Sequence, residues 1–231
     1  MSIFAIGDLH LSLHQEKPMD IFGEIWENHA EKLKVNWTGK VCKSDTVLVV
    51  GDHSWALKLE EAIPDLKFIG ALPGKKFLIK GNHDLWWQSL KKMNKVLPEG
   101  LFLIQNNHCS AEGMSICGSR GWVCPDDEDF ESHDYKVYRR ELMRLENSMR
   151  SAKHAHPQQD LIVMLHYPPF DLNGKPSGFV KLMQEYGVRT CVYGHLHGDT
   201  AQYAVNGTIQ GITYYLVACD YVNFSPKLIN P

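Results

Sequence analysis

Residues 3–10 read IFAIGDLH, a short apolar run that turns at Gly7 into Asp8 and His10. The same pattern, an apolar run that ends abruptly in glycine or histidine and polar residues, recurs along the chain. Seven such runs occupy residues 3–6, 46–50, 76–79, 114–117, 161–165, 190–193 and 213–217. Because these runs show little polar alternation and are separated by stretches of helix length, they predict strands that are buried on both faces in an α/β fold.

Three of the intervening stretches have the apolar spacing of helices. We expect helices over residues 20–34, 133–153 and 177–186, and the second is the clearest because its apolar residues repeat every three or four positions among many charges. The chain has 231 residues, of which 44% are hydrophobic and 22% charged, and it contains neither an internal repeat nor a Gly/Ser linker. A single domain over residues 1–231 is therefore the simplest expectation.

Side chains suited to catalysis follow five of the predicted strands directly. They are Asp8 and His10, Asp52, Asn82 with His83 and Asp84, His166, and His195 with His197. In open α/β sheets, ligands bind at the carboxyl ends of the strands, because the loops there project several side chains into one crevice. The sequence thus predicts that five loops bring these residues to one rim.

The types of side chain at this rim indicate a metal site. Carboxylate and amide oxygens combined with imidazole nitrogens suit borderline divalent ions such as Mn, Fe, Zn or Co, whereas Ca and Mg prefer shells of oxygen alone. Thiolates are missing from the set, which argues against a structural zinc site. With this many ligands we expect two metal ions, most simply from Mn, Fe and Zn, which together would promote in-line attack at phosphorus.

The five blocks, in their order, resemble the calcineurin-like metallophosphoesterase superfamily. Its members carry an Asp-x-His, a Gly-Asp, a Gly-Asn-His-Asp/Glu, a lone His and a Gly-His-x-His, and here the blocks run from Asp8 to His197. Each block alone is weak evidence, but the ordered set is specific. The resemblance implies an α/β fold of the four-layer α/β/β/α type, in which two mixed sheets face each other and helices flank them.

The resemblance also implies a role for each residue of the set. One metal ion would be held by Asp8, His10 and His197. The other would be held by Asn82, His166 and His195, and Asp52 would bridge the two. His83 matches the histidine that acts as a general acid or an electrostatic clamp beside the metals, and Asp84 matches the acidic residue that orients it.

The second block departs from the family pattern. Many members continue it as Gly-Asp-x-x-Asp or Asn, whereas this chain reads Gly51-Asp52-His53-Ser54-Trp55. His53 then has three interpretations: a substrate contact, an additional neighbour of the metals, or a surface residue at the end of a strand.

Aromatic residues and one arginine lie near the predicted rim. Trp55, Arg120 and Tyr167 are the candidate substrate-binding residues, and the guanidinium of Arg120 suits a second phosphate or a carboxylate. Trp86 and Trp87 fit a substrate wall and a core position equally well.

We therefore expect a metal-dependent phosphoric ester hydrolase that cleaves a phosphate monoester or diester by in-line attack of a metal-bridging hydroxide. The alternatives are a Ser/Thr-type protein phosphatase, a nuclease and a catalytically silent metal-binding scaffold for protein partners. With 24 Lys and Arg against 27 Asp and Glu, the net charge of −3 disfavours a nuclease. A silent scaffold predicts decayed ligands, whereas the set here is complete.

Six cysteines without a C-x-x-C pair, and an N-terminus without the features of a signal peptide, predict a cytoplasmic protein with free thiols. The expected partner is a small phosphate ester; the sequence carries no strong signal for nucleic-acid binding, and no membrane is expected. The sequence does not decide the oligomeric state.

Overall fold

The computed structural model describes residues 1–14, 17, 19–128 and 130–230, and it contains two mixed β-sheets. The first sheet has the strand order β11 (Lys227–Ile229), β1 (Ile3–Ile6), β2 (Thr46–Val49), β3 (Lys75–Leu78) and β4 (Leu101–Leu103). The second has the order β5 (Cys109–Ala111), β6 (Met114–Ser119), β7 (Leu161–Leu165), β8 (Thr190–Tyr193), β10 (Ile212–Leu216) and β9 (Gly207–Ile209). In each sheet the inner strands run parallel. β11, β5 and β9 lie antiparallel at the edges.

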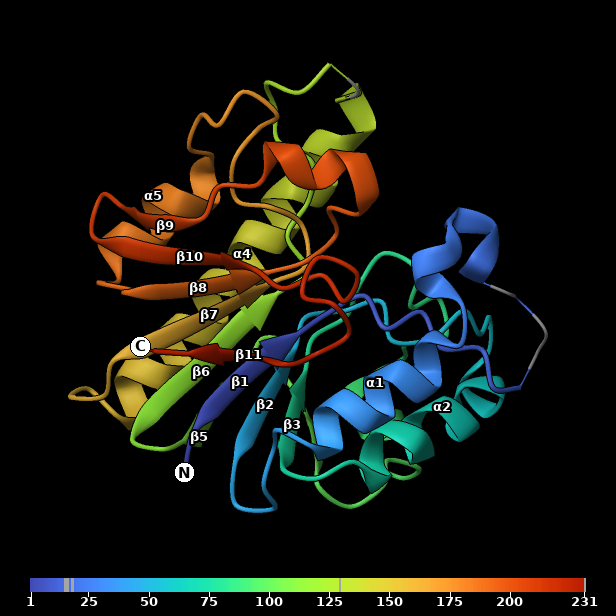
Figure 1. Cartoon of the computed structure of the whole chain (residues 1–231). Helices are drawn as coiled ribbons and strands as arrows, with labels where there is room; N and C mark the ends of the chain where they lie inside the picture. The colour runs from blue at the N-terminus through green and yellow to red at the C-terminus, as the bar shows by residue number, and fades with distance from the viewer. Residues whose placement is uncertain (15–16, 18, 129, 231) are drawn as a thin grey trace.

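Helices cover the outer face of each sheet (Figure 1). The α-helices are α1 (His29–Thr38), α2 (Leu59–Ala71), α3 (Leu90–Met93), α4 (Ser132–Ala155) and α5 (Gly178–Glu185). Short 3-10 helices occupy Met19–Phe22, Glu24–Trp26 and Gly198–Tyr203. α1 and α2 lie on one side of the molecule, and α4 and α5 lie on the other.

The buried side chains form three layers of hydrophobic core, because successive residues of a strand point to opposite faces. Phe4 and Ile6 of β1 pack with Leu33 and Trp37 of α1. Their neighbours in β1 face the other way and pack, with the rest of that face, against the second sheet. The outer face of the second sheet packs against α4 and α5. The fold is thus the expected four-layer α/β/β/α sandwich of two mixed sheets.

The seven predicted strands and the helices predicted at 133–153 and 177–186 are present, with ends shifted by one or two residues. The prediction of one helix over residues 20–34 is wrong. The backbone turns at Gly23, with φ 125°, and again at Asn28, with φ 51°, so two 3-10 turns precede α1, which begins at His29. Positive φ is incompatible with a continuous right-handed helix.

Among the described residues, no helix is long and apolar enough to cross a membrane.

Candidate metal centre

The loops that follow β1, β2, β3, β7 and β8 meet at one end of the two sheets, as parallel strands require. A first group of ligand atoms comes from Asp8, His10 and His197. Oδ1 of Asp8 lies 3.3 Å from Nε2 of His197, and the Nε2 atoms of His10 and His197 are 3.4 Å apart. These three side chains therefore converge on one point, although His197 is nearly 190 positions along the chain from Asp8.

A second group of ligand atoms lies beside the first. Oδ1 of Asn82 is 2.6 Å from Nε2 of His166 and 3.1 Å from Nδ1 of His195. Asp52 stands between the two groups, because its Oδ2 is 3.4 Å from Nε2 of His166 and 3.8 Å from Nε2 of His10. This is the position that a bridging carboxylate needs.

Hydrogen bonds outside the two groups orient several of the imidazole rings. Nδ1 of His197 donates to Oδ1 of Asp220 at 2.9 Å, and Nδ1 of His166 donates to the carbonyl oxygen of Val50 at 2.9 Å. Each bond leaves Nε2 of the same ring directed into the site. Such partners commonly fix the tautomer and orientation of metal-binding histidines.

The electrostatics of the site fit a bound cation. Burial lowers the pKa of His10, His166 and His195 to about 3, so these rings are neutral at pH 7, which is the form that binds metal. Burial, with the charges of Asp84 and Asp8, raises the pKa of Asp52 to about 9. The ionised form of Asp52 is thus poorly stabilised by the chain itself, and metal ions would stabilise it.

His197 differs from the other three histidines. Burial lowers its pKa, but Asp8 and Asp220 together outweigh that effect and raise it to about 10. A cation bound between Asp8 and His197 would take the place of this proton, because metal binding and protonation compete for the same nitrogen.

Four of these residues adopt backbone conformations that are rare outside glycine. Asp8, His10, Asp52 and His195 have φ of 58°, 44°, 51° and 72°. Such residues cost about 1–3 kcal/mol each and persist where the surrounding structure enforces them, typically at functional sites. Here the amide of Asp8 donates to Gly51 O and the amide of His10 donates to Asp52 O, both at 2.9 Å, so the first two loops hold each other.

Gly81 allows the third loop to approach the second. A Cβ atom at this position would collide with the backbone nitrogen and Oδ1 of Asp52. The glycine is therefore required by close packing beside the proposed bridging residue.

The structure gives Asp84 a set of hydrogen-bond partners within the loops of the site. This residue is fully buried, and its carboxylate accepts hydrogen bonds from the amides of Gly81, Asp52 and His53 at 2.7–3.0 Å. It also pairs with Nδ1 of His53 at 2.9 Å. Although burial opposes its ionisation, His53 and the loop amides hold the pKa of Asp84 well below its usual value. Among the described residues its hydrogen bonds fasten the loops together, and none reaches the ring of His83.

His53 is completely buried, which rules out its interpretation as a surface residue at the end of a strand. Its ring stacks on Trp87 at a centroid distance of 6.0 Å. Trp86 and Trp87 are themselves buried in the core, and Nε1 of Trp86 donates to Asp84 at 3.1 Å. His53, Trp86 and Trp87 therefore form a buried cluster around Asp84.

His83 is exposed at the mouth of the site. Its amide donates to Oδ1 of Asp52 at 2.8 Å, and its ring lies 4.5 Å from the ring of Trp55 and 5.6 Å from that of His10. Partial burial lowers its pKa. The ring is thus accessible to a ligand and close to the first group of candidate metal ligands.

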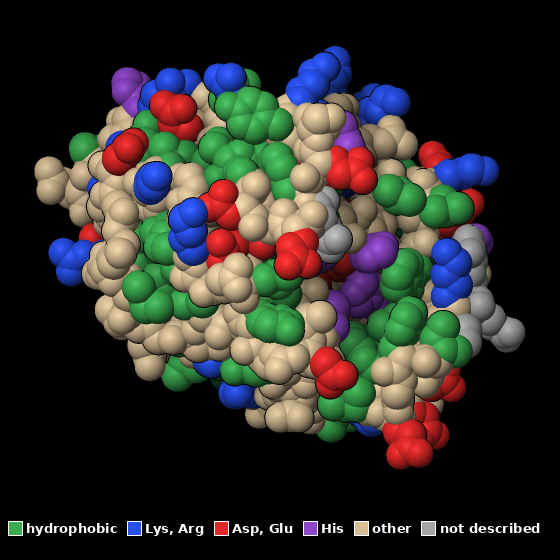
Figure 2. Space-filling view, turned by 90° about the horizontal axis from the view of Figure 1, so that it is seen from above, with side chains coloured by type: hydrophobic (Ala, Val, Ile, Leu, Met, Phe, Trp, Pro, Cys, Tyr) green, Lys and Arg blue, Asp and Glu red, His purple; other side chains and the backbone are tan. Residues whose placement is uncertain are grey.

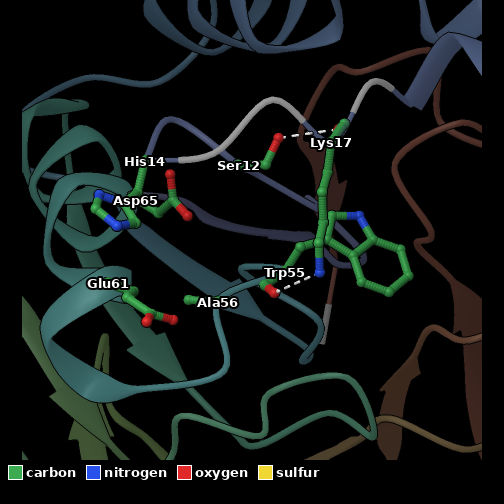
Figure 3. A pocket seen from close by; sticks show the side chains of 7 residues that line it. All are labelled: Ser12, His14, Lys17, Trp55, Ala56, Glu61 and Asp65. Carbon is green, nitrogen blue, oxygen red and sulfur yellow. Dashed lines mark hydrogen bonds between the residues drawn. The ribbon is translucent and has the colours of Figure 1, made fainter.

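Trp55 forms one wall beside the site, since it stacks on His10 at 4.8 Å with an interplanar angle of 23°. Figure 3 shows Trp55 beside Lys17, whose Nζ donates to Trp55 O at 3.4 Å. In the same view, Asp65 of α2 lies beneath the loop that carries Ser12 and His14. Asp65 accepts from the amide of Leu13 at 2.8 Å and from the hydroxyl of Ser54, so one buried carboxylate anchors both the loop after β1 and the loop after β2 that carries Trp55.

The other two candidate substrate-binding residues differ in their placement. Tyr167 packs on His195 at a centroid distance of 4.1 Å and lines a cavity of about 310 Å³ on that side of the site. Arg120 lies over the ring of Trp122 at 4.2 Å and pairs with the buried carboxylate of Glu141 at 3.5 Å. The structure thus brings Tyr167 to the ligand groups, whereas the guanidinium of Arg120 is held at α4.

Sequence reasoning did not single out Asp220 or Trp26. Asp220 follows the predicted strand at 213–217 by three residues, so its place at a strand end was the available signal. Trp26 packs edge-on against His197 at 5.7 Å, from a segment that was expected to be helical.

The sequence matches the calcineurin-like phosphoesterase family over residues 1–199. A comparison with curated proteins finds no match. Among solved structures, the phosphopantetheinyl hydrolase of Mycobacterium tuberculosis aligns with a TM-score of 0.61 at 13% identity, covering 100% of this chain and 96% of that one.

Two further structures align with the chain. They are a protein of unknown function, AQ665, from Aquifex aeolicus (TM-score 0.51, 15% identity, 98% of this chain and 95% of that one) and TT1561 of Thermus thermophilus (TM-score 0.56, 15% identity, 84% and 81%). At these identities the likeness concerns the fold. With 199 of its 231 residues matched, and with the five motif loops gathered at one end of the sheets, the chain belongs to the calcineurin-like phosphoesterase family.

Proposed function

We propose that the protein hydrolyses phosphoric esters with the help of two divalent metal ions. The observation that carries this proposal is the convergence of two groups of ligand atoms on Asp52, whose Oδ2 lies within 4 Å of an imidazole nitrogen from each group. Two such groups sharing one carboxylate are the arrangement that dinuclear phosphoester hydrolysis requires.

Asp8, His10 and His197 would hold one ion. Asn82, His166 and His195 would hold the other, with Asp52 shared. When bound, the ions would act as Lewis acids on the phosphoryl oxygens and activate water for in-line attack.

The remaining residues position the substrate and move a proton. His83 would hold a proton for the departing alcohol oxygen or stabilise charge on a phosphoryl oxygen, which is typically worth about 10²- to 10⁴-fold in rate. Asp84 would keep the second and third loops in register, and Asp220 would keep Nε2 of His197 directed into the site.

Cavities on both sides of the ligand groups favour a diester substrate. One, of about 470 Å³, is lined by His10, His83 and His197, and the other, of about 310 Å³, is lined by His195 and Tyr167. A diester has two alcohol substituents and would fill both cavities, whereas a monoester would leave one of them to water.

The test compares p-nitrophenyl phosphate with bis(p-nitrophenyl) phosphate on the Mn²⁺-loaded protein. We expect turnover that chelation abolishes, preference for the diester, and at least a 100-fold lower kcat in His83→Ala. His133→Ala is the matched control, because His133 lies on α4 with 69% of its side chain exposed, and it should retain full activity.

If the protein binds two equivalents of Mn²⁺ by calorimetry yet hydrolyses neither ester, the proposal fails and the catalytically silent scaffold is favoured. Turnover of a phosphoserine peptide with neither small ester cleaved would favour the protein phosphatase instead.

A further inference from the structure

A groove of about 470 Å³ opens beside the first group of metal ligands, and its walls are mainly hydrophobic. Met19, Phe22, Ile25, Trp26 and Trp55 form the apolar part, and we call this cavity the apolar groove. Figure 2 shows histidine side chains at the bottom of a hollow with hydrophobic side chains along its flank. The volume is within the range of small-molecule binding sites.

The apolar wall is in direct contact with the proposed catalytic residues. The ring of Trp26 lies edge-on to His10 at 6.1 Å and to His197 at 5.7 Å. Trp55 stacks on His10 and touches His83, and its Nε1 donates to the sulfur of Met19 at 3.1 Å. The groove is therefore continuous with the metal centre.

The outer part of this wall leaves hydrophobic surface uncovered. Phe22 is 62% exposed and Ile25 is 47% exposed, although both line the groove. Both side chains come from the two 3-10 turns, which are held in place because Nζ of Lys32 donates to Ile25 O at 2.9 Å. Apolar side chains so exposed beside a polar site are typical of ligand contacts.

The charges around the groove indicate what would not bind there. Residues 19–28 contain Asp20, Glu24 and Glu27 and no Lys or Arg. All three acidic residues are exposed. Two lysines also lie at this wall, Lys17 over the ring of Trp55 and Lys32 bonded to Ile25 O. Acidic side chains still outnumber basic ones there, so the wall favours an uncharged apolar group over an anionic one such as a second phosphate or a nucleic-acid backbone.

On the strength of the proposed phosphoesterase function, we propose that the substrate carries an uncharged apolar alcohol and that the apolar groove binds this alcohol as the leaving group. The assignment to the leaving group follows from His83, which lines the same groove and would protonate the departing oxygen. Phe22 and Ile25 would then determine specificity for the apolar group. A water oxygen would form the new bond to phosphorus as the bond to the alcohol oxygen breaks; the alcohol would leave with the proton from His83, and the proton lost by the attacking water would restore His83.

Binding of phosphonates tests this proposal without turnover. Methylphosphonate and hexylphosphonate carry the same charge but differ by five methylene groups, each worth about 0.8 kcal/mol when fully buried. With about half of that surface buried, hexylphosphonate should bind the Mn²⁺-loaded protein about 30-fold more tightly in calorimetry.

The double variant Phe22→Ser/Ile25→Ser should reduce this ratio to a few-fold. Its matched control is Ile21→Ser, because Ile21 is 74% exposed on the same 3-10 turn but does not line the groove, so the ratio should persist. None of the three side chains is part of the buried core, so their replacement should leave the core unchanged.

Equal affinity for the two phosphonates, or a ratio that survives the double variant, would overturn the apolar-alcohol proposal while leaving the phosphoesterase function standing. If neither phosphonate binds to protein that holds Mn²⁺, the proposed function itself fails and this inference fails with it. Absence of phosphonate binding would instead favour a role for the exposed Phe22 and Ile25 as a docking surface for a protein partner.

Discussion

Replacing Asp84 with Asn tests whether this buried carboxylate fastens the loops of the metal centre. Its Oδ2 accepts from the amides of Gly81 and Asp52, at 2.7 and 3.0 Å, and from Nδ1 of His53, at 2.9 Å. Its Oδ1 accepts from the amide of His53 at 2.9 Å and from Nε1 of Trp86 at 3.1 Å. Both oxygens are therefore saturated by donors.

An asparagine side chain has only one accepting oxygen. Its NH₂ group would face two or three of these donors, which would then have no acceptor. Each buried donor left without an acceptor costs about 1–3 kcal/mol, and two or three such donors would be exposed to this cost. We expect Asp84→Asn to lower the free energy of unfolding by about 3–5 kcal/mol. For a chain of this length that corresponds to a fall in Tm of roughly 6–20 °C.

The assay is guanidinium unfolding of the metal-free protein, followed by calorimetric Mn²⁺ binding. Asp199→Asn is the matched control, because Asp199 is exposed near the site and its replacement should change the unfolding free energy by no more than about 0.5 kcal/mol. An Asp84→Asn variant that unfolds within about 1 kcal/mol of the wild type, but turns over slowly, would refute this reasoning. It would instead support the role of orienting His83 that the family resemblance implies.

Three further expectations follow from the geometry. Asp220→Ala should weaken Mn²⁺ binding by about 10- to 100-fold in calorimetry, because the ring of His197 loses the hydrogen bond that orients it. Unchanged Mn²⁺ affinity would show that this hydrogen bond is dispensable. Gly81→Ala should lower the free energy of unfolding by about 1–3 kcal/mol in guanidinium titrations, since its Cβ would collide with Asp52, and a loss below about 0.5 kcal/mol would contradict the close packing. Burial raises the pKa of four core thiols above 9.0, namely those of Cys117, Cys124, Cys191 and Cys219. Above pH 9 the unfolded chain therefore releases thiol protons that the folded chain retains. The contribution of each thiol to the free energy of unfolding is fully present below that pH and falls by about 1.4 kcal/mol at pH 10. A free energy of unfolding that stays level from pH 8 to 10 would be inconsistent with this.

The parts of the fold that the sequence predicted are those in which local pattern and burial agree. Every predicted strand lies in the interior of a sheet, where both faces are covered and a continuous apolar run results. The four strands that it did not predict, β4, β5, β9 and β11, have three residues each and lie at the sheet edges. An edge strand is stabilised by pairing with its neighbour, and three residues are too few to show a periodicity.

The gathering of the candidate residues at one rim was predictable, because chain order and strand ends together determine which loops meet there. The prediction of one helix over 20–34 was wrong for a local reason that helix propensity does not reveal. Asn28 takes a left-handed conformation, which separates the 3-10 turns from α1. Phe22 and Ile25, which precede Asn28, line the groove beside the candidate metal centre.

The sequence by itself determined the inner strands, the residue types that gather at their ends and the family to which the chain belongs, because each is encoded in short, ordered segments. The tertiary structure alone decided that Asp84 pairs with His53, that Asp220 holds His197 and that an apolar groove adjoins the site. These contacts join segments that no local pattern connects, since they exist only once both sheets and their loops have packed.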